Sequence, residues 1–172
     1  MSTAPLVFLR PLEDDDRFRT TAWRNDPETR DAMMSYRLPV TAAMEARWFR
    51  SVLDGKRQDE VHFALAEPVH GACVGLTSLR EIDQFSSTAW VSILIGDRAF
   101  RHSGLGKVAL EQLMAYAKDT LALRKLGARI LDFNAASQRL FQAVGFQPEG
   151  RLKEQVFVKG AFHDLLLYGR FL

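Results

Sequence analysis

The sequence predicts a mixed α/β or α+β fold, on the basis of three observations. Short apolar runs rich in β-branched residues indicate strands, and longer amphipathic stretches between them indicate helices. Strands and helices alternate along the chain, an order typical of a sheet flanked by helices. The length of 172 residues suits one hydrophobic core, so we expect residues 1–172 to form a single domain.

The first half predicts one short strand and three helices. The apolar run 6–9 is β-prone and is closed by Arg10-Pro11. The acidic run 13–16 precedes a predicted helix over 17–23, and acidic residues stabilise a helix start. Arg24-Asn25-Asp26-Pro27 ends that helix, because a residue before proline is pushed out of the α region. A shorter helix through Met34 and an amphipathic helix over 41–53 follow.

The second half predicts most of the sheet. Strands are expected over 61–66, 72–79 and 88–95, with 68–71 as a hairpin connection. The remaining elements are a helix over 106–121, a strand over 128–131, a helix over 136–144, and two strands over 151–158 and 162–171. These elements complete a sheet with helices in the connections.

Composition excludes several classes of protein. Lys and Arg number 23 against 21 Asp and Glu, and this net charge of +2 argues against a nucleic-acid-binding chain. No apolar run approaches the ~20 residues of a membrane span. A single cysteine, Cys73, excludes an intramolecular disulfide and a multi-cysteine metal site. The first five residues show no basic region followed by an apolar core, so we expect a cytoplasmic protein.

The segment Arg101-His102-Ser103-Gly104-Leu105-Gly106-Lys107 lies between a predicted strand and a predicted helix. Glycines in such a loop let backbone N–H groups approach a phosphate, and the helix N-terminus adds positive potential. The alternative is a tight turn that binds nothing, but the flanking cations favour phosphate. A dinucleotide fingerprint is disfavoured because the loop lies past the middle of the chain, and a Walker A loop because Val108 follows Lys107.

The pattern Arg101-x-x-Gly104-x-Gly106 resembles the acetyl-CoA loop of the GCN-five-related N-acetyltransferases (GNAT). A second segment, from Asn134 through Ser137, Leu140 and Phe141 to Gly145-Phe146 and Glu149-Gly150, is similar to a downstream motif of that family. The resemblance covers nearly the whole chain. It implies the acyl-CoA N-acyltransferase fold, with a central, mostly antiparallel sheet flanked by helices.

The resemblance also implies where acetyl-CoA binds. Backbone near Ile95 and Gly96 is expected to hold the pantetheine arm, and Arg101, His102, Ser103, Gly104, Leu105, Gly106 and Lys107 the pyrophosphate. Asn134 is expected near the pantetheine and Phe141 beside the sulfur. Many relatives carry tyrosine at the position of Phe141, and phenylalanine has no proton for the leaving thiolate. Ser137, one turn earlier, is the remaining hydroxyl, with water or a purely capping role for Ser137 as alternatives.

The acceptor side is expected around the first helices. Glu45 is the candidate general base, against the alternative of a solvated helix carboxylate, and His62 is a weaker candidate acting through water. Arg24 and Tyr36 are candidate acceptor-binding residues. No metal and no covalent acetyl-enzyme are implied.

Two branches of the family are similar to this chain in three segments: Trp23-Arg24-Asn25-Asp26-Pro27, Glu149-Gly150-Arg151-Leu152-Lys153 and Asp164-Leu-Leu-Leu-Tyr168. One acetylates amino-sugar nucleotides and the other acetylates protein N-termini, so the acceptor is expected to be a small-molecule amine, first of all an amino-sugar nucleotide, or a protein N-terminus. A non-catalytic acyl-CoA sensor is the alternative from another class. An exposed edge among the last strands suits a homodimer.

Overall fold

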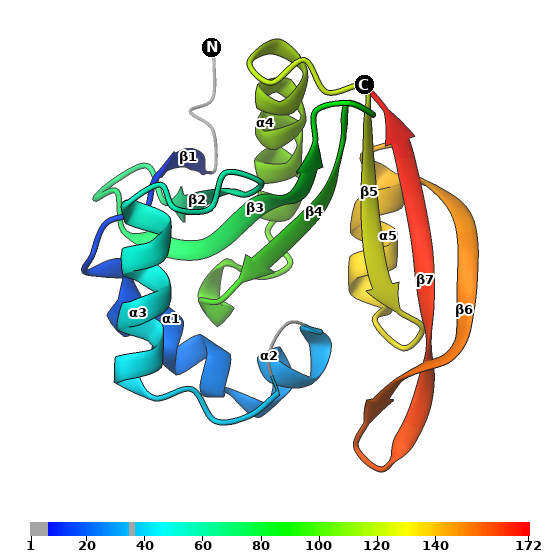
Figure 1. Ribbon diagram of the computed structural model, residues 1–172. Helices are drawn as coiled ribbons and strands as arrows, with labels where there is room; N and C mark the ends of the chain where they lie inside the picture. The colour runs from blue at the N-terminus through cyan, green and yellow to red at the C-terminus, as the bar shows by residue number, and fades with distance from the viewer. Residues whose placement is uncertain (1–6, 35–36) are drawn as a thin grey trace.

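The computed structural model describes residues 7–34 and 37–172, and its strands form one mixed sheet in the order β1-β2-β3-β4-β5-β7-β6 (Figure 1). The first four strands are antiparallel neighbours: β1 (Phe8–Pro11), β2 (Val61–Ala66), β3 (Cys73–Asp83) and β4 (Thr88–Ile95). The pair of β4 with β5 (Lys125–Leu131) is parallel, and β7 (Ala161–Phe171) then pairs antiparallel with both β5 and β6 (Gln147–Val158). The expected fold class is confirmed.

The helices cover both faces of this sheet (Figure 1). On one face lie α1 (Asp16–Asn25) and α3 (Ala42–Leu53), with the short α2 (Pro27–Ala32) near the ends of β3 and β4. On the other face lie α4 (Leu105–Asp119) and α5 (Ala135–Ala143). A short 3₁₀ turn, Arg98–Phe100, joins β4 to the loop before α4.

The main core forms where α4 and α5 pack on the sheet. Leu110 and Leu113 of α4 are completely buried, as the amphipathic pattern predicted. They pack with Leu126 of β5 and with Phe146, which follows α5. This packing fixes both helices behind β4 and β5.

The acidic run before α1 has a different role from the expected helix capping. Asp15 occupies the N-cap position but its side chain accepts no capping hydrogen bond. Asp16 is buried, and its two carboxylate oxygens accept from the guanidinium of Arg10 at 2.8 Å each. Asp16 therefore ties α1 to β1, because a bidentate pair holds two elements in fixed orientation.

Several strands are longer than the sequence predicted. β3 extends to Asp83, β5 begins at Lys125 and β6 begins at Gln147. Apart from Ile82 and Leu126 the extra residues are polar, glycine or proline, so hydrophobic pattern alone does not indicate them. They are strand residues because a neighbouring strand accepts and donates their backbone hydrogen bonds, a tertiary effect.

Gly127 is a specific requirement of the β4–β5 pair. A Cβ at Gly127 would lie 2.7 Å from the ring of Trp90, its partner across the pair. We expect Gly127→Ala to lower the free energy of unfolding by about 1–3 kcal/mol, because the indole must move.

Chemical denaturation measures this effect, and Gly150→Ala is the matched control. A Cβ at Gly150 meets its nearest atom at 3.4 Å, an ordinary contact. Equal stability of the Gly127 variant and wild type would contradict the close packing of Trp90.

Candidate functional site

The two halves of the sheet separate after a short parallel pairing of β4 with β5. Only Thr88, Ala89 and Trp90 pair with β5, opposite Lys125, Leu126 and Gly127. Beyond this point β4 stays with β3 as far as Ile95, whereas β5 stays with β7 as far as Leu131. Among the described residues, no strand lies beside the edge of β4 from 91 to 95 on the β5 side, and the backbone groups of this edge face an opening.

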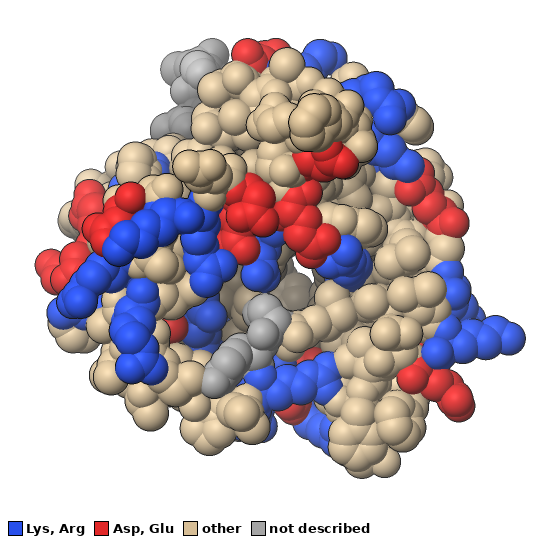
Figure 2. Space-filling model, in the orientation of Figure 1, with Lys and Arg blue, Asp and Glu red and all other residues tan. Residues whose placement is uncertain are grey.

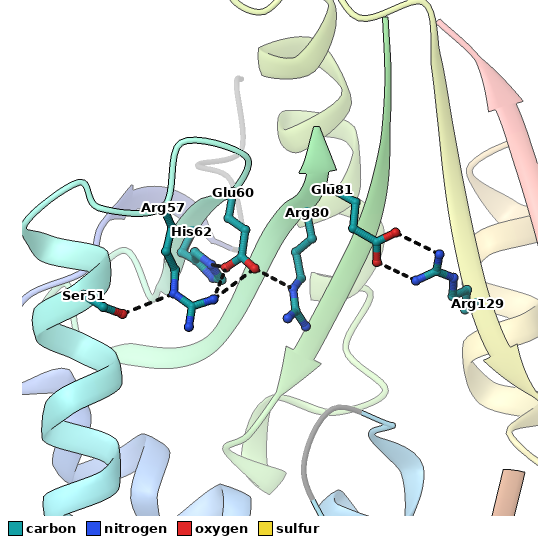
Figure 3. A network of polar contacts seen from close by, with 7 residues as sticks. All are labelled: Ser51, Arg57, Glu60, His62, Arg80, Glu81 and Arg129. Atoms are coloured by element: carbon teal, nitrogen blue, oxygen red, sulfur yellow. Dashed lines mark hydrogen bonds and ion pairs between the residues drawn. The ribbon is translucent and has the colours of Figure 1, made fainter. Parts of the chain in front are cut away.

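A cavity of about 1030 Å³ occupies the opening between β4 and β5. It is lined on one side by β4 and on the other by β5, α5 and part of β6. Trp90 marks the point where the strands part. The guanidinium of Arg129 lies 3.9 Å from the Trp90 ring centroid and forms a two-point ion pair with Glu81 at 2.6 and 3.0 Å (Figure 3).

The glycine loop forms the far end of this larger cavity. Gly104 takes the left-handed conformation (φ +85°) and is the N-cap of α4, so the first N–H groups of the helix point toward the loop. A Cβ at Gly106 would meet Leu140 Cδ2 at 3.0 Å and Ile95 Cδ1 at 3.3 Å. The cavity is lined by Arg101, His102, Gly104, Gly106 and Lys107. A helix N-terminus with two cations suits a pyrophosphate.

Three other residues expected at the cofactor do not line the larger cavity. Gly96 donates its N–H to the Val74 carbonyl at 3.0 Å and packs so closely on Trp23 that a Cβ would lie 2.0 Å from it. The side chain of Leu105 is buried in the core, and Ser103 Oγ donates to the Phe100 carbonyl. These residues shape the loop and the end of β4.

Arg101 connects three elements around the mouth of the larger cavity. Its Nε donates to the Ile95 carbonyl at 3.0 Å, and its Nη1 lies 3.2 Å from Glu28 Oε2. Its Nη2 reaches Thr29 Oγ1 at 3.4 Å. The guanidinium thus holds the glycine loop against β4 and α2.

The N-terminus of α5 brings three expected residues to the larger cavity. Asn134 is the N-cap, and its Oδ1 accepts from the backbone N–H of Ser137 at 3.1 Å. The capping role that was the alternative for Ser137 therefore belongs to Asn134. Phe141, only 3% exposed, lines the cavity and packs edge-on against Phe146 with 5.0 Å between ring centroids.

A smaller cavity of about 310 Å³ lies on the α1–α3 face of the sheet. It shares Met33, Arg80, Ser92 and Leu94 with the larger cavity, so the two meet at β4. Acidic and basic side chains gather around a hollow on this face (Figure 2). The remaining lining residues are Arg24, Val40, Met44, Glu45, Trp48, Arg57, His62, Leu76, Thr77 and Ser78.

Glu45 and Arg24 form a buried pair in the smaller cavity. Glu45 is 1% exposed, so it is not a solvated helix carboxylate. Its Oε1 accepts from Thr20 Oγ1 at 2.6 Å and lies 3.1 Å from Arg24 Nε. Burial lowers the pKa of Arg24, an effect that the Glu45 charge opposes, and the guanidinium stacks on Trp48 at 4.4 Å. Tyr36 lies outside the described residues.

The rest of this face carries a charged network that the sequence did not reveal (Figure 3). Glu60 accepts two hydrogen bonds from Arg57 Nη1 at 3.1 Å, and its Oε2 lies 2.8 Å from His62 Nε2. Its Oε1 lies 3.6 Å from Arg80 Nε. Cationic and hydrogen-bonding partners lower the pKa of Glu60 against an opposing desolvation effect, whereas burial lowers the pKa of His62.

Two cavities that join at β4 suit a protein that brings two small molecules together. Residues 7–147 match the family described as "Acetyltransferase (GNAT) domain". The chain therefore belongs to this family and is an acetyl-CoA-dependent N-acetyltransferase, as its glycine loop predicted.

Sequence and structure comparisons agree with this assignment. The chain is 26% identical over 144 residues to the SPbeta prophage-derived uncharacterized N-acetyltransferase YokL of Bacillus subtilis strain 168, covering 84% of this chain and 78% of YokL. Its fold matches the crystal structure of Vibrio cholerae spermidine N-acetyltransferase in complex with CoA and spermine (TM-score 0.89, 19% identity, 98% and 96% of the two chains). It also matches RimL, a ribosomal L7/L12 alpha-N-protein acetyltransferase in complex with coenzyme A (TM-score 0.85, 17% identity, 99% and 97%).

Residues 7–34 and 37–172 contain no helix long and apolar enough to cross a bilayer. The same residues contain no group of three or more His, Cys, Asp or Glu side chains arranged to hold a metal ion.

Cys73 is an inert thiol in this fold. It is 2% exposed, and burial raises its pKa to about 11. At pH 8 only about one thiol in a thousand is then a thiolate, the reactive form. We expect native protein to resist a thiol reagent at pH 8 and urea-unfolded protein to react at once. Rapid stoichiometric labelling of the native protein would contradict the burial.

Proposed function

We propose that acetyl-CoA binds in the larger cavity, that an amine enters the smaller cavity, and that the amine attacks the thioester directly in a ternary complex. The observation that carries this proposal is the meeting of the two cavities at Ser92 and Leu94 of β4. A nucleophile and a thioester brought together where the cavities join gain from proximity and orientation. No covalent acetyl-enzyme is required.

Within the larger cavity, the N-terminus of α4 with Arg101 and Lys107 would hold the pyrophosphate. The unpaired edge of β4 up to Ile95 would hold the pantetheine as an added strand. Asn134 would lie along the pantetheine and Phe141 beside the sulfur, because both line the same cavity. The thioester supplies an activated acetyl group at the point where the cavities meet.

The leaving thiolate needs a proton after the tetrahedral intermediate collapses. Ser137 lines the larger cavity one turn before Phe141, which carries no hydroxyl. We assign the proton donor to Ser137, with water as the alternative. Glu45 stays the sequence-based candidate for general base, and its pairing with Arg24 and Thr20 also suits a second role as counter-ion.

The charges of the smaller cavity support an acceptor that carries an anionic group. Arg24, Arg57 and Arg80 line it. They face two carboxylates, Glu45 beside Arg24 and Glu60 beside Arg57 and Arg80, so the guanidinium groups outnumber the carboxylates by one. Guanidinium groups bind phosphate or carboxylate in two-point geometry, and Arg24 on Trp48 adds a stacking surface. We therefore propose an amino-sugar nucleotide as acceptor, with the N-terminus of a protein as the second candidate. A polyamine such as spermidine fits this cavity poorly because like charges repel.

The test is acetyl-CoA binding by calorimetry followed by thiol release with three amines. The amines are a 4-amino-sugar nucleotide, a peptide with a free N-terminus, and spermidine. We expect binding, and turnover with the amino-sugar nucleotide. Turnover with the peptide alone would assign the second candidate, and turnover with spermidine alone would contradict the charge argument. Binding without turnover would favour an acyl-CoA sensor.

The control for cofactor placement is Gly106→Trp. Gly106 lines the larger cavity in the first turn of α4, so an indole there would occupy the space proposed for the cofactor. This variant should keep its circular dichroism spectrum and lose acetyl-CoA binding. Retained binding would mean that the glycine loop is only a turn.

Ser137→Ala tests the proton donor. We expect a lower kcat, by about 100-fold if the hydroxyl is the general acid, with acetyl-CoA affinity nearly unchanged. The reason is that the hydroxyl acts on the departing sulfur and does not hold the cofactor. An unchanged kcat would assign the proton transfer to water.

A further inference from the structure

Three polar side chains form a row across the sheet beneath the smaller cavity. His62 of β2 pairs in register with Ser78 of β3, and Ser78 pairs with Ser92 of β4. Residues directly opposite one another in antiparallel strands place their side chains on the same face, with Cβ atoms about 4.5–5.5 Å apart. All three line the smaller cavity, and Ser92 lines both cavities. The row therefore leads from the meeting point of the cavities to an imidazole.

The imidazole at the end of this row is held in a fixed orientation. Its Nε2 lies 2.8 Å from Glu60 Oε2, and its ring packs edge-on against Trp48 with 5.2 Å between centroids. Glu60 is itself held by Arg57 (Figure 3). Because the carboxylate accepts the Nε2 proton, Nδ1 is the nitrogen left with a lone pair.

We propose that His62 is the general base of this acetyltransferase and that Ser78 and Ser92, with water in the cavity, relay the proton from the acceptor amine to it. Glu60 is a positioning residue that fixes the tautomer and stabilises the imidazolium. This inference rests on the proposed function, since it requires an amine in the smaller cavity. It gives Glu45 the role of counter-ion to Arg24.

The acceptor amine arrives as R–NH₃⁺ and loses one proton along the row to His62. The neutral amine attacks the thioester carbon, a C–N bond forms, and the C–S bond breaks. A second proton from the amine nitrogen compensates the thiolate through Ser137 or water, giving the amide and free thiol. The imidazolium then returns its proton to solvent.

The charges around His62 suit this chemistry. Burial, the largest effect, lowers the pKa of His62, so the imidazole is neutral at pH 7 and has a free lone pair for a proton; the Glu60 contact opposes that shift. The positive charges of the cavity also lower the pKa of an ammonium bound there, so the proton leaves it more readily. The charged groups facing His62 or sharing its cavity are Glu60, Arg57, Arg80, Arg24 and Glu45.

The experiment is the pH dependence of kcat/KM for wild type, His62→Gln and Glu60→Gln, with whichever amine supports turnover. The kcat/KM of the wild type should fall toward acid pH, and this acid limb should have an apparent pKa below the usual ~6.5 of histidine. His62→Gln should lose about 100-fold in kcat at pH 7, and this acid limb should disappear. Glu60→Gln should shift the limb to lower pH, because the Glu60 contact raises the pKa of His62. A merely structural role for either residue would not move the limb.

Two further variants keep the test decisive. Ser78→Ala interrupts the row without touching the imidazole, so it should lower kcat and leave the acetyl-CoA KM and the limb in place. His70→Gln, at an exposed histidine outside the cavity, should behave as wild type. If His62→Gln does not fold, the pH profile of Glu60→Gln and the kcat of Ser78→Ala test the proposal instead. An acid limb unchanged in His62→Gln or Glu60→Gln overturns this inference alone, whereas absence of turnover with every amine overturns the proposed function as well.

Discussion

The separation of β4 from β5 is the constraint on which the rest of the molecule depends. The two strands pair only through Thr88–Trp90 and Lys125–Gly127, and the close packing of Trp90 over Gly127 marks the end of the pairing. Beyond that point each strand continues with its other neighbour. The sheet therefore opens without losing its outer hydrogen bonds, and the opening exposes one edge of β4 to a large cavity. A continuous sheet would close this cavity.

The charged residues around the smaller cavity can be buried at low energetic cost because each of them has a partner of opposite charge or a hydrogen-bonding partner. Glu45 faces Arg24 and Thr20, and Glu60 faces His62, Arg57 and Arg80. An unpaired charge in such positions would be costly. The arrangement leaves the cavity with more guanidinium groups than carboxylates and with one neutral imidazole. Both features agree with the acceptor and the general base proposed above.

The glycine loop and the α5 motif could be predicted from the sequence. The burial of Glu45 was not predicted, although the spacing of apolar residues in α3 indicated it. Glu45 lies one helical turn before Phe49, and both are buried on the same face of α3. Residues four apart share a helix face, so the position of Glu45 next to an apolar stripe indicated burial. Its partner Arg24 lies on another helix, and no sequence pattern predicts that two helices bring these side chains together.

The sequence by itself determined the local features: the order of strands and helices, the glycine loop before α4, and the family to which the chain belongs. These depend on backbone conformation and on neighbouring residues, which a contiguous motif specifies. Only the tertiary structure decided the smaller cavity and the row of His62, Ser78 and Ser92. Their proximity results from the register of β2, β3 and β4. Register depends on long-range pairing and packing, so residues far apart in the chain acquire a shared role only when the sheet forms.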